Sequence, residues 1–392
     1  MTHFNEPGRI VITCPKGIAP YLRNELTAIG FPILSELVAG VETEGTLADT
    51  MNINLRLRTG HRVLFLVHEF TADNPEELYE EIGRFPWETY IDDSGYLSVT
   101  STVDNITIRD PRYANVKVKD GIVDRFFKNV GRRPDSGPRK NRTVIHLFWQ
   151  NRRCAVYLDT SGEPVSRHGY RKIPMRAPMQ ETLAAATIGA TGWSGDGHFV
   201  NPMCGSGTLA IEAALIAVKR PPGLLRSNFG FMHIKGFDRA LWKKIRADAY
   251  GKTMKSFNGT VTATDIDRRA VEAARKNAET AGVKHLIDFK VCDFSVTEIP
   301  PGPGIIMVNP EYGERLGEIQ KLKDTYRRIG DFFKQKCQGY RGYIFTGNLD
   351  LAKHVGLRTQ RRLTFFNGPI ECRLLEYDIY EGGRQSGNND TA

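Results

Sequence analysis

A short loop late in the chain combines residue types that could handle an amine: Asn309-Pro310-Glu311-Tyr312. The Asn309 side-chain oxygen and the Pro310 backbone carbonyl can both accept hydrogen bonds from the exocyclic amine of a base, which turns the nitrogen lone pair toward an electrophile. Tyr312 offers a face on which a flipped or unpaired base can stack. We predict that Asn309, Pro310 and Tyr312 are catalytic residues. Their chemistry would need no metal, nucleophilic side chain or dedicated general base, because an enzyme acting on a sulfonium methyl group mainly positions the nucleophile in line.

An isolated Asn-Pro pair usually marks a turn. The loop therefore indicates a functional site only in combination with the motifs before it. The first is Asn-Pro-Met-Cys-Gly-Ser-Gly-Thr at residues 201–208, between a predicted strand and a predicted helix. Gly205 and Gly207 would let the backbone approach a ligand, and the helix N-terminus would offer unpaired N–H groups to it. A Gly-x-Gly pair alone is a weak signal for a nucleotide site.

Two acidic residues at the ends of apolar strands follow in order. Asp265 ends the run at residues 261–265, and a carboxylate there can accept both ribose hydroxyls of an adenosine ligand. Asp267 is better explained as a helix N-cap. Asp293 follows the next strand and can accept from an adenine amino group, with Phe294 covering the ring, although a simple loop aspartate is as good a reading for that residue alone. The loop at Asn309 comes fourth in this order, which favours a site over a turn.

The second half of the chain alternates between strands and helices, which predicts a largely parallel sheet with helices on both faces. The loop at Asn309 would then lie at the carboxyl edge of that sheet, where open α/β folds bind ligands. The predicted elements are helix 182–188, strand 199–200, a helix from 208, strand 261–264, a helix from 268, strands 287–291 and 305–308, helix 326–334 and strand 342–345.

The first half has short mixed elements without a Gly-rich phosphate loop, which is typical of an α+β region. We expect strands at 10–13, 63–67 and 96–103, helices at 19–29, 75–84 and 120–128, and a hairpin of strands 144–149 and 154–158 around Asn151-Arg152. A basic, Pro- and Gly-rich segment at 131–142 and a second basic stretch at 167–172 follow, and the domain boundary is predicted nearby.

Composition is that of an ordinary globular protein with a basic bias. The 392 residues are 40% hydrophobic and 25% charged, and 54 Lys and Arg against 45 Asp and Glu give a formal charge of +9. This balance suits a polyanionic partner but is equally compatible with a mildly basic enzyme. The six cysteines form no C-x-x-C pair and are expected to be reduced. We see no secretory signal and no apolar run long enough to span a membrane, so we expect a cytoplasmic protein.

These motifs resemble a known family, the bacterial THUMP-domain RNA methyltransferases of the RlmL type, which methylate guanine N2 in 23S rRNA. The resemblance covers nearly the whole chain. Its motifs are Cys-Pro-Lys-Gly at 14–17, Val-Lys-Asp-Gly-Ile-Val-Asp at 118–124, Asp-Thr-Ser-Gly at 159–162, Ala-Pro-Met-Gln-Glu-Thr-Leu-Ala-Ala at 177–185, the loop at 202–208 and Asn-Gly-Pro-Ile-Glu-Cys at 367–372. The last two are the most specific matches.

The resemblance implies a Rossmann-like, class I S-adenosylmethionine (SAM)-dependent methyltransferase domain preceded by an α+β ferredoxin-like and THUMP region. The implied domains are a ferredoxin-like element at 1–60, a THUMP RNA-binding domain at 61–165, a linker at 166–185, the methyltransferase domain at 186–381 and a disordered tail at 382–392. The expected cofactor is SAM and the expected partner is RNA, with 23S rRNA ranked first, and no membrane or metal.

The residues expected at each site follow from the motifs and the resemblance together. Those expected around the cofactor are Pro178, Glu181, Asn201, Pro202, Cys204, Gly205, Ser206, Gly207, Thr208, Asp265, Ile266, Asp293, Phe294 and Asn309. The candidate phosphate contacts are Arg132, Arg133, Arg139, Lys140, Arg142, Arg167 and Arg171. The segment between Thr208 and Asp265 is unusually long, and its basic and aromatic residues, including Trp242, Lys243 and Lys244, could either touch RNA or form a solvated helix face.

At three positions the chain departs from the family pattern: it has Asn201 in place of Asp, His168 in place of Arg and Glu311 in place of Pro. Glu311 puts a charge beside the target base and bears on substrate choice. Other functions stay open: a tRNA guanine-N2 methyltransferase with the same architecture, a DNA adenine-N6 methyltransferase with the same Asn-Pro-x-aromatic chemistry, and, because of Glu311, a non-catalytic RNA-binding assembly factor. A nicotinamide oxidoreductase is the weakest alternative, because its dinucleotide loop needs a third glycine.

Overall fold

The computed structural model describes residues 3–108, 110–173, 175, 178–313 and 316–379, and these form two compact units. Unit 1 comprises residues 1–169 and 220–253, and unit 2 comprises residues 170–219 and 254–392. The chain therefore leaves unit 1, returns to it and leaves it again. The predicted disordered tail at 382–392 lies outside the described residues. Among those residues, no helix is long and apolar enough to cross a membrane.

Unit 1 is built on one eight-stranded sheet with the order β2-β3-β1-β4-β8-β7-β5-β6. Strand β4 joins the two parts of this sheet, because it pairs antiparallel with β1 on one side and with β8 on the other. The strands are β1 (Gly8–Thr13), β2 (Ile33–Leu37), β3 (Gly40–Gly45), β4 (Arg62–Thr71), β5 (Tyr96–Asp104), β6 (Asp135–Ser136), β7 (Thr143–Gln150) and β8 (Arg153–Asp159).

Helices α1 (Ala19–Ala28), α2 (Leu47–Arg56), α3 (Pro75–Arg84) and α4 (Pro111–Val130) belong to unit 1. Helix α2 begins with a capping box in which Thr46 and Asp49 satisfy each other's backbone N–H groups. Helices α3 and α4 approach closely, because a side chain at Gly121 would meet Ile82 at 2.9 Å. The same unit holds the returning segment with α7 (Arg239–Gly251), whose Trp242 is buried against Phe229 and Phe231.

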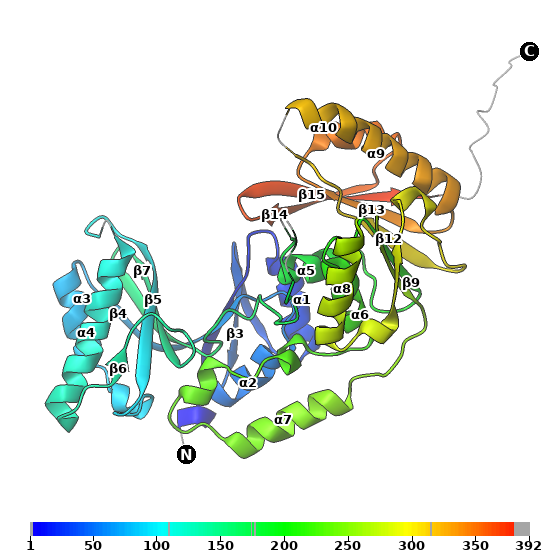
Figure 1. Ribbon diagram of the computed structural model, residues 1–392. Helices are drawn as coiled ribbons and strands as arrows, with labels where there is room; N and C mark the ends of the chain where they lie inside the picture. The colour runs from blue at the N-terminus through cyan, green and yellow to red at the C-terminus, as the bar shows by residue number, and fades with distance from the viewer. Residues whose placement is uncertain (1–2, 109, 174, 176–177, 314–315, 380–392) are drawn as a thin grey trace, which may run out of the picture. The chain divides into compact units, whose positions relative to one another are not determined.

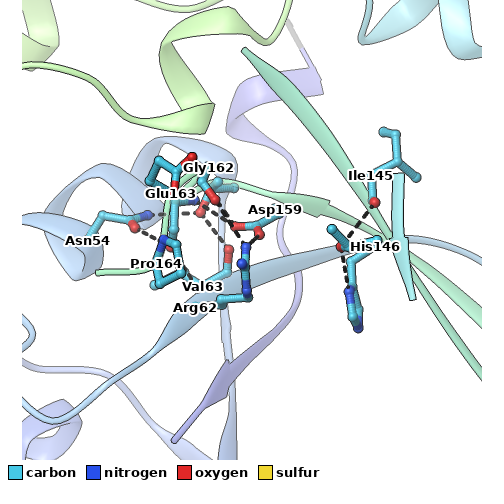
Figure 2. A network of polar contacts seen from close by, with 12 residues as sticks. Asn54, Arg62, Val63, Ile145, His146, Asp159, Gly162, Glu163 and Pro164 are labelled. Atoms are coloured by element: carbon cyan, nitrogen blue, oxygen red, sulfur yellow. Dashed lines mark hydrogen bonds and ion pairs between the residues drawn. The ribbon is translucent and has the colours of Figure 1, made fainter. Parts of the chain in front are cut away.

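A buried polar network forms where β8 ends and gives the Asp-Thr-Ser-Gly sequence a structural role (Figure 2). Asp159 is fully buried; it forms an ion pair with Arg62 and accepts from the backbone N–H groups of Ser161 and Gly162 at 3.0 and 3.2 Å. Asn54 of α2 donates to the Thr160 hydroxyl at 2.8 Å and accepts from the Ser161 hydroxyl at 2.7 Å. The turn after β8 therefore ties α2 and the start of β4 together.

We predict that Asp159→Ala destabilises unit 1 by about 3–5 kcal/mol, because it leaves the Arg62 guanidinium buried without its counter-charge. Urea unfolding followed by tryptophan fluorescence measures this, since Trp87, Trp149 and Trp242 all lie in unit 1. The control is Glu69→Ala, which removes an exposed ion pair with Arg9 in the same unit and should change the free energy of unfolding by less than about 0.5 kcal/mol. Equal effects of the two variants would contradict the prediction.

Unit 2 contains a seven-stranded sheet with the order β11-β10-β9-β12-β13-β15-β14. The first five strands in this order are parallel, and β15 and β14 add to the edge in antiparallel pairing. The strands are β9 (His198–Pro202), β10 (Val261–Asp265), β11 (Ile287–Val291), β12 (Gly304–Val308), β13 (Arg341–Thr346), β14 (Arg361–Asn367) and β15 (Ile370–Asp378).

Helices cover both faces of this sheet, as the alternation of elements predicts (Figure 1). They are α5 (Glu181–Ala190), α6 (Thr208–Ala217), α8 (Arg268–Ala281), α9 (Leu316–Lys336) and α10 (Leu349–Ala352). Against one face, Tyr326, Ile329 and Phe333 of α9 pack in a buried cluster with Ile306 and Ile344 of the central strands. The parallel strands inside the sheet, β10, β9, β12 and β13, are buried along most of their length, which explains their largely apolar sequences, whereas the edge strand β11 alternates buried and exposed residues.

The mixed α/β sheet with an α+β region before it confirms the predicted fold class, but several elements differ from their predicted extent. Helix α4 begins at Pro111 instead of residue 120, after the N-cap Asp110, and α9 begins at Leu316 instead of 326. The hairpin around Asn151 is confirmed as β7–β8, with Asn151 at φ 52°. The pairs β2–β3 and β14–β15 were not predicted. Residues 220–253 fall in unit 1, whereas our proposed boundaries include them in the methyltransferase domain.

Candidate functional site

The site in unit 2 lies where the connections of the sheet reverse direction. Strands β9 and β12 are adjacent and parallel, although β10 and β11 come between them in sequence and lie on the far side of β9. Open α/β sheets bind ligands at such a point, outside the carboxyl ends of the strands. The loops after β9, β10 and β12 carry Gly205, Asp265 and Asn309, so the fold brings the predicted residues to one edge of the sheet.

The glycine loop after β9 has the open backbone that the sequence predicts. Gly205 and Gly207 have φ values of +55° and +82°, a region that strongly favours glycine. A side chain at Gly207 would come within 2.8 Å of Ala274, so this glycine lets α8 approach the loop. Gly205 faces open space instead, with nothing within 4 Å of an added Cβ. Space beside Gly205 and the N-terminus of α6 is therefore available to a ligand.

Asp265 links the glycine loop to the loop after β10. One carboxylate oxygen, Oδ2, accepts from the Gly205 N–H at 2.9 Å, and the other, Oδ1, accepts from the Asp267 N–H at 2.9 Å. Each oxygen keeps a lone pair, so the fixed carboxylate can still accept from two vicinal hydroxyls. Asp267 caps α8 by accepting from the Arg269 N–H, which confirms its predicted role as an N-cap. Ile266 is 72% exposed and offers an apolar surface beside the carboxylate.

Asp293 is held in place by hydrogen bonds from Arg328 and Ser295. Its Oδ1 accepts from the Arg328 guanidinium at 2.6 Å, and from the Ser295 backbone and hydroxyl at 2.9 and 2.6 Å. Partial burial alone would raise the pKa of the Asp293 carboxyl, but these hydrogen bonds hold the pKa below its ordinary value. Asp293 therefore remains an ionised acceptor as the solution becomes acidic.

Phe294 has a placement that differs from the expectation. It is only 6% exposed and belongs to the core cluster beneath the sheet, with Phe332 edge-on at 6.1 Å and the Arg328 guanidinium 4.8 Å above its ring. This placement favours a core role for the ring over the expected cover for an adenine. The exposed Ile266 is the better candidate for that contact.

The low pKa of Asp293 predicts a pH dependence of SAM binding. A depressed carboxyl pKa means that binding through the carboxylate persists as the pH falls and is lost only when the pH passes below the folded pKa. In Arg328→Gln the pKa of Asp293 rises, so affinity should begin to fall at a higher pH than in the wild type. Calorimetric titration with SAM at a series of pH values measures this. An identical pH profile for the two proteins would argue against Asp293 as a cofactor contact.

Two side-chain oxygens at the reversal point have no hydrogen-bond partner among the described residues. Asn201 is 1% exposed and donates through Nδ2 to the Met307 carbonyl at 2.9 Å, which bridges β9 and β12. Its Oδ1 and the Oδ1 of Asn309 are both buried and accept no hydrogen bond from the part of the chain that the structure describes. A buried acceptor without a donor costs free energy. A ligand that brings N–H or O–H groups to this crevice would remove that cost.

Tyr312 is half-buried, and its hydroxyl accepts from the Asn367 side-chain amide at 2.9 Å. Its ring lies against Gly347, because a Cβ there would approach Tyr312 Cδ2 and Cε2 to 3.0 Å. Burial raises the pKa of Tyr312, so the phenol is neutral at physiological pH. Gly347 also lines a cavity of about 370 Å³ together with Thr346, Asn348, Leu349, Asp350, Glu371 and Arg373. Glu311 is exposed beside Pro310, which is buried.

The segment before α5 is held to the glycine loop by two polar side chains, Arg171 and Asn277. Arg171, only 16% exposed, donates to the Met179 carbonyl at 2.5 Å and to the Thr208 hydroxyl at 3.1 Å, and pairs with Glu181 at 3.4 Å. The buried Asn277, which the sequence motifs do not include, accepts from the backbone N–H groups of residues 172 and 173, and donates to the Ser206 carbonyl at 3.2 Å. This placement favours a positioning role for Arg171 over the predicted RNA contact.

The remaining predicted cofactor residues lie on the same segments. Pro178 is half-buried in the loop before α5, whereas Ala177 lies outside the described residues. Pro202 ends β9, and Cys204 is 8% exposed with its N–H on the Thr264 carbonyl at 2.9 Å. Burial raises the pKa of the Cys204 thiol, so it is not a nucleophile at neutral pH.

Unit 1 gathers several of the predicted RNA-binding side chains. Burial lowers the pKa of His61, and the nearby charges of Arg62, Arg167 and Lys140 lower it further. Lys140 and Arg167 therefore both act on His61 although they come from separate basic stretches. Arg132, Arg139 and Arg142 are exposed. Arg133 is partly neutralised, because it pairs with Asp124 at 2.7 Å and lies over Phe127.

Trp242 and His168, whose roles the sequence left open, have structural roles. Trp242 is 5% exposed in an aromatic cluster of unit 1, so it is a core residue, whereas Lys243 and Lys244 beside it are exposed. His168 is buried and its Nε2 lies 3.2 Å from the Arg58 carbonyl. His168, which this chain has in place of the family's Arg, therefore packs inside unit 1.

Comparison with known proteins agrees with this arrangement. Residues 168–376 match the family model described as the RMKL-like methyltransferase domain, which covers more than half of the chain. The chain belongs to this family. Residues 9–64 match the RlmL ferredoxin-like domain and residues 72–159 match the THUMP domain, so an RMKL-like methyltransferase domain here follows two further modules.

Individual relatives extend the comparison over almost the whole chain. The ribosomal RNA large subunit methyltransferase K/L of Syntrophotalea carbinolica is 36% identical over 385 residues, which are 96% of this chain but 54% of that protein. The chain thus spans about half the length of the curated relatives it matches. A crystal structure of a candidate methyltransferase complexed with SAH has a TM-score of 0.87 and 26% identity, covering 96% of this chain and 100% of the other. A Listeria monocytogenes structure, named a predicted N6-adenine-specific DNA methylase, has a TM-score of 0.85 and 27% identity, covering 95% and 97%.

Proposed function

We propose that this chain is a SAM-dependent RNA methyltransferase that transfers a methyl group to the exocyclic N2 amine of a guanine in 23S rRNA. The observation that carries the proposal is the buried Asn309 Oδ1, which accepts no hydrogen bond from the described residues and lies at the carboxyl end of β12, three residues before a half-buried tyrosine. An amine hydrogen is the donor that this oxygen lacks. The other features of the site agree with an adenosine ligand beside it.

Asp265, Ile266, Asp293 and the glycine loop are the residues that would hold SAM, whose sulfonium supplies an electrophilic methyl group when bound. The residues of the chain then act on the amine. Asn309 Oδ1 and the Pro310 carbonyl accept hydrogen bonds from its two N–H groups, which directs the lone pair toward the methyl carbon and stabilises positive charge that develops on the nitrogen. Tyr312 stacks on the base and keeps it in line. As the N–CH3 bond forms, the S–CH3 bond of the bound SAM would break and leave the neutral thioether S-adenosylhomocysteine. One proton leaves the product amine to solvent.

An RNA substrate is supported by unit 1 and by the names of the relatives. The THUMP match and the positive charges around His61 suit a phosphate backbone, and the K/L relative is named for the large-subunit ribosomal RNA. Guanine N2 as the target follows from the resemblance of the motifs to the RlmL type. A ribosomal RNA substrate would locate the reaction in the bacterial cytoplasm.

Methylation assays with radiolabelled SAM test the substrate directly. We expect transfer to deproteinised 23S rRNA from a strain that lacks this protein, and N2-methylguanosine in a nuclease digest of the product. Labelling of bulk tRNA alone would replace the proposal by a tRNA guanine-N2 methyltransferase. Mass-spectrometric mapping of the product identifies the nucleotide.

We predict that Asn309→Ala abolishes methyl transfer and leaves the affinity for SAM within a few fold of the wild type. The variant removes an acceptor that acts on the amine in the transition state, which typically lowers kcat by about 10²–10³. Calorimetry gives the affinity and the labelling assay gives the rate. Loss of SAM binding in this variant would mean that the loop at Asn309 supports the cofactor instead of the base.

The double variant Arg139→Ala with Lys140→Ala should weaken RNA binding most at low salt, because each side chain that binds a phosphate releases a counterion. Filter binding at several salt concentrations measures the slope of log affinity against log salt. This slope should become less steep by about one for each phosphate that the variant no longer neutralises. Arg84→Ala is the control, since Arg84 is exposed in unit 1 but already paired with Glu80 and Glu81. Unchanged binding by the double variant would exclude this surface.

Two other functions make distinct predictions. The name of the Listeria structure and the Asn-Pro-x-Tyr loop together motivate a DNA adenine-N6 methyltransferase. Transfer to duplex DNA but not to RNA would favour it. Glu311 motivates a non-catalytic RNA-binding factor, which the absence of SAM binding by the folded protein would favour.

A further inference from the structure

The β14–β15 hairpin contains the Asn-Gly-Pro-Ile-Glu-Cys sequence at 367–372, whose motif is specific but has no assigned role. Asn367 ends β14, Gly368 and Pro369 form the turn, and Cys372 lies in β15 with no exposed surface. In the antiparallel register Asn367 is opposite Ile370 and Phe365 is opposite Cys372. This register places Asn367 and Cys372 on the same face of the hairpin, near its turn.

Both residues meet the hydroxyl of Tyr312. The Asn367 Nδ2 donates to it at 2.9 Å, and the buried Cys372 thiol lies close enough that each group shifts the pKa of the other. The phenol oxygen thus accepts from an amide, and its O–H can turn toward the Cys372 sulfur as an acceptor. The pKa of Cys372 is raised by burial, which keeps it a neutral thiol beside the phenol.

A third contact holds the ring itself. Gly347, in the turn after β13, lies so close that a Cβ would come within 3.0 Å of two Tyr312 ring carbons and of Ile370. Gly347 does not have a positive φ, so its lack of a side chain serves the close approach and not the backbone conformation. Gly347 also lines a cavity of about 370 Å³, so the glycine that touches the ring borders open space as well.

We propose that Asn367, Cys372 and Gly347 are positioning residues that clamp Tyr312 in one orientation, so that its free face is set for the incoming base. The consequence of the clamp for an RNA base rests on the proposed function. The clamp itself is a property of the protein alone. A tyrosine fixed before the base arrives loses no further side-chain entropy on stacking. The hairpin thereby acts on the reaction through Tyr312 without touching the amine.

A double-mutant cycle between Tyr312 and Asn367 tests the clamp. Tyr312→Phe keeps the ring and removes the hydroxyl, and Asn367→Ala removes the donor. We expect each to lower kcat/KM for deproteinised 23S rRNA by about two- to tenfold, with SAM affinity unchanged. The double variant should be no worse than Tyr312→Phe, because both changes remove one interaction. Losses that multiply in the double variant, or a loss of SAM affinity, would overturn the proposal.

Matched variants test the other two contacts. Cys372→Ser keeps an acceptor and should retain most of the activity that Cys372→Ala loses. Gly347→Ala crowds the ring and should lower kcat/KM, whereas Gly189→Ala, at a position with nothing within 4 Å, should not. Equal activity of the two cysteine variants, or of the two glycine variants, would count against the clamp.

A measurement without methyl transfer separates the clamp from the proposed function. In protein with ¹³C-labelled tyrosine, two-fold flips of the Tyr312 ring should be slow in the wild type and faster in Asn367→Ala and Cys372→Ala. Unchanged flipping would refute the clamp whatever the substrate is. Slow flipping in a wild-type protein that methylates no RNA would instead refute the proposed function alone.

Discussion

The hydrogen bond from the Gly205 N–H to Asp265 Oδ2 is the contact on which the cofactor side of the site depends. It joins the loop after β9 to the loop after β10, and the second oxygen of the same carboxylate holds the start of α8 through the Asp267 N–H. One side chain therefore sets the conformation of two loops and the direction of a helix. This is possible because β9 and β10 are parallel neighbours that end at the same level of the sheet.

On the side of the site that would take the base, residues far apart in sequence fix one aromatic side chain. Asn309 and Tyr312 come from the loop after β12, but Tyr312 is held by residues from the turn after β13 and from the last hairpin. The antiparallel strands β15 and β14 extend the parallel sheet just far enough to bring Asn367 and Cys372 to that tyrosine. An edge hairpin of this kind is part of the site as well as part of the fold.

The sequence predicted the parallel core well because its strands are buried on both faces and read as short apolar runs. It also predicted Asp265 and Asp267 at their observed places, since strand ends and helix caps have local signals. The β14–β15 hairpin was missed because β14 opens with Arg361 and Arg362 and is half exposed, so its identity as a strand depends on pairing with β15. Asn277 gives no local signal either: within a helical pattern it reads as one more polar residue, and only packing brings it to Ser206. Phe294 shows the opposite difficulty: an aromatic residue next to a predicted ligand was assigned to the ligand, whereas its place in the buried cluster favours a core role.

The return of residues 220–253 to unit 1 has a consequence for how the protein is made. Phe231 and Trp242 are buried in that unit, and the Phe231 N–H bonds to the Thr160 carbonyl at the turn after β8. Unit 1 thus stays incomplete on the ribosome until α7 has emerged, and by then α5, β9 and α6 of unit 2 are already outside the exit tunnel without their partners β10 and β12. During synthesis the N-terminal unit therefore does not finish folding first. Unit 1 needs residues 220–253, and unit 2 needs strands that are made only after them.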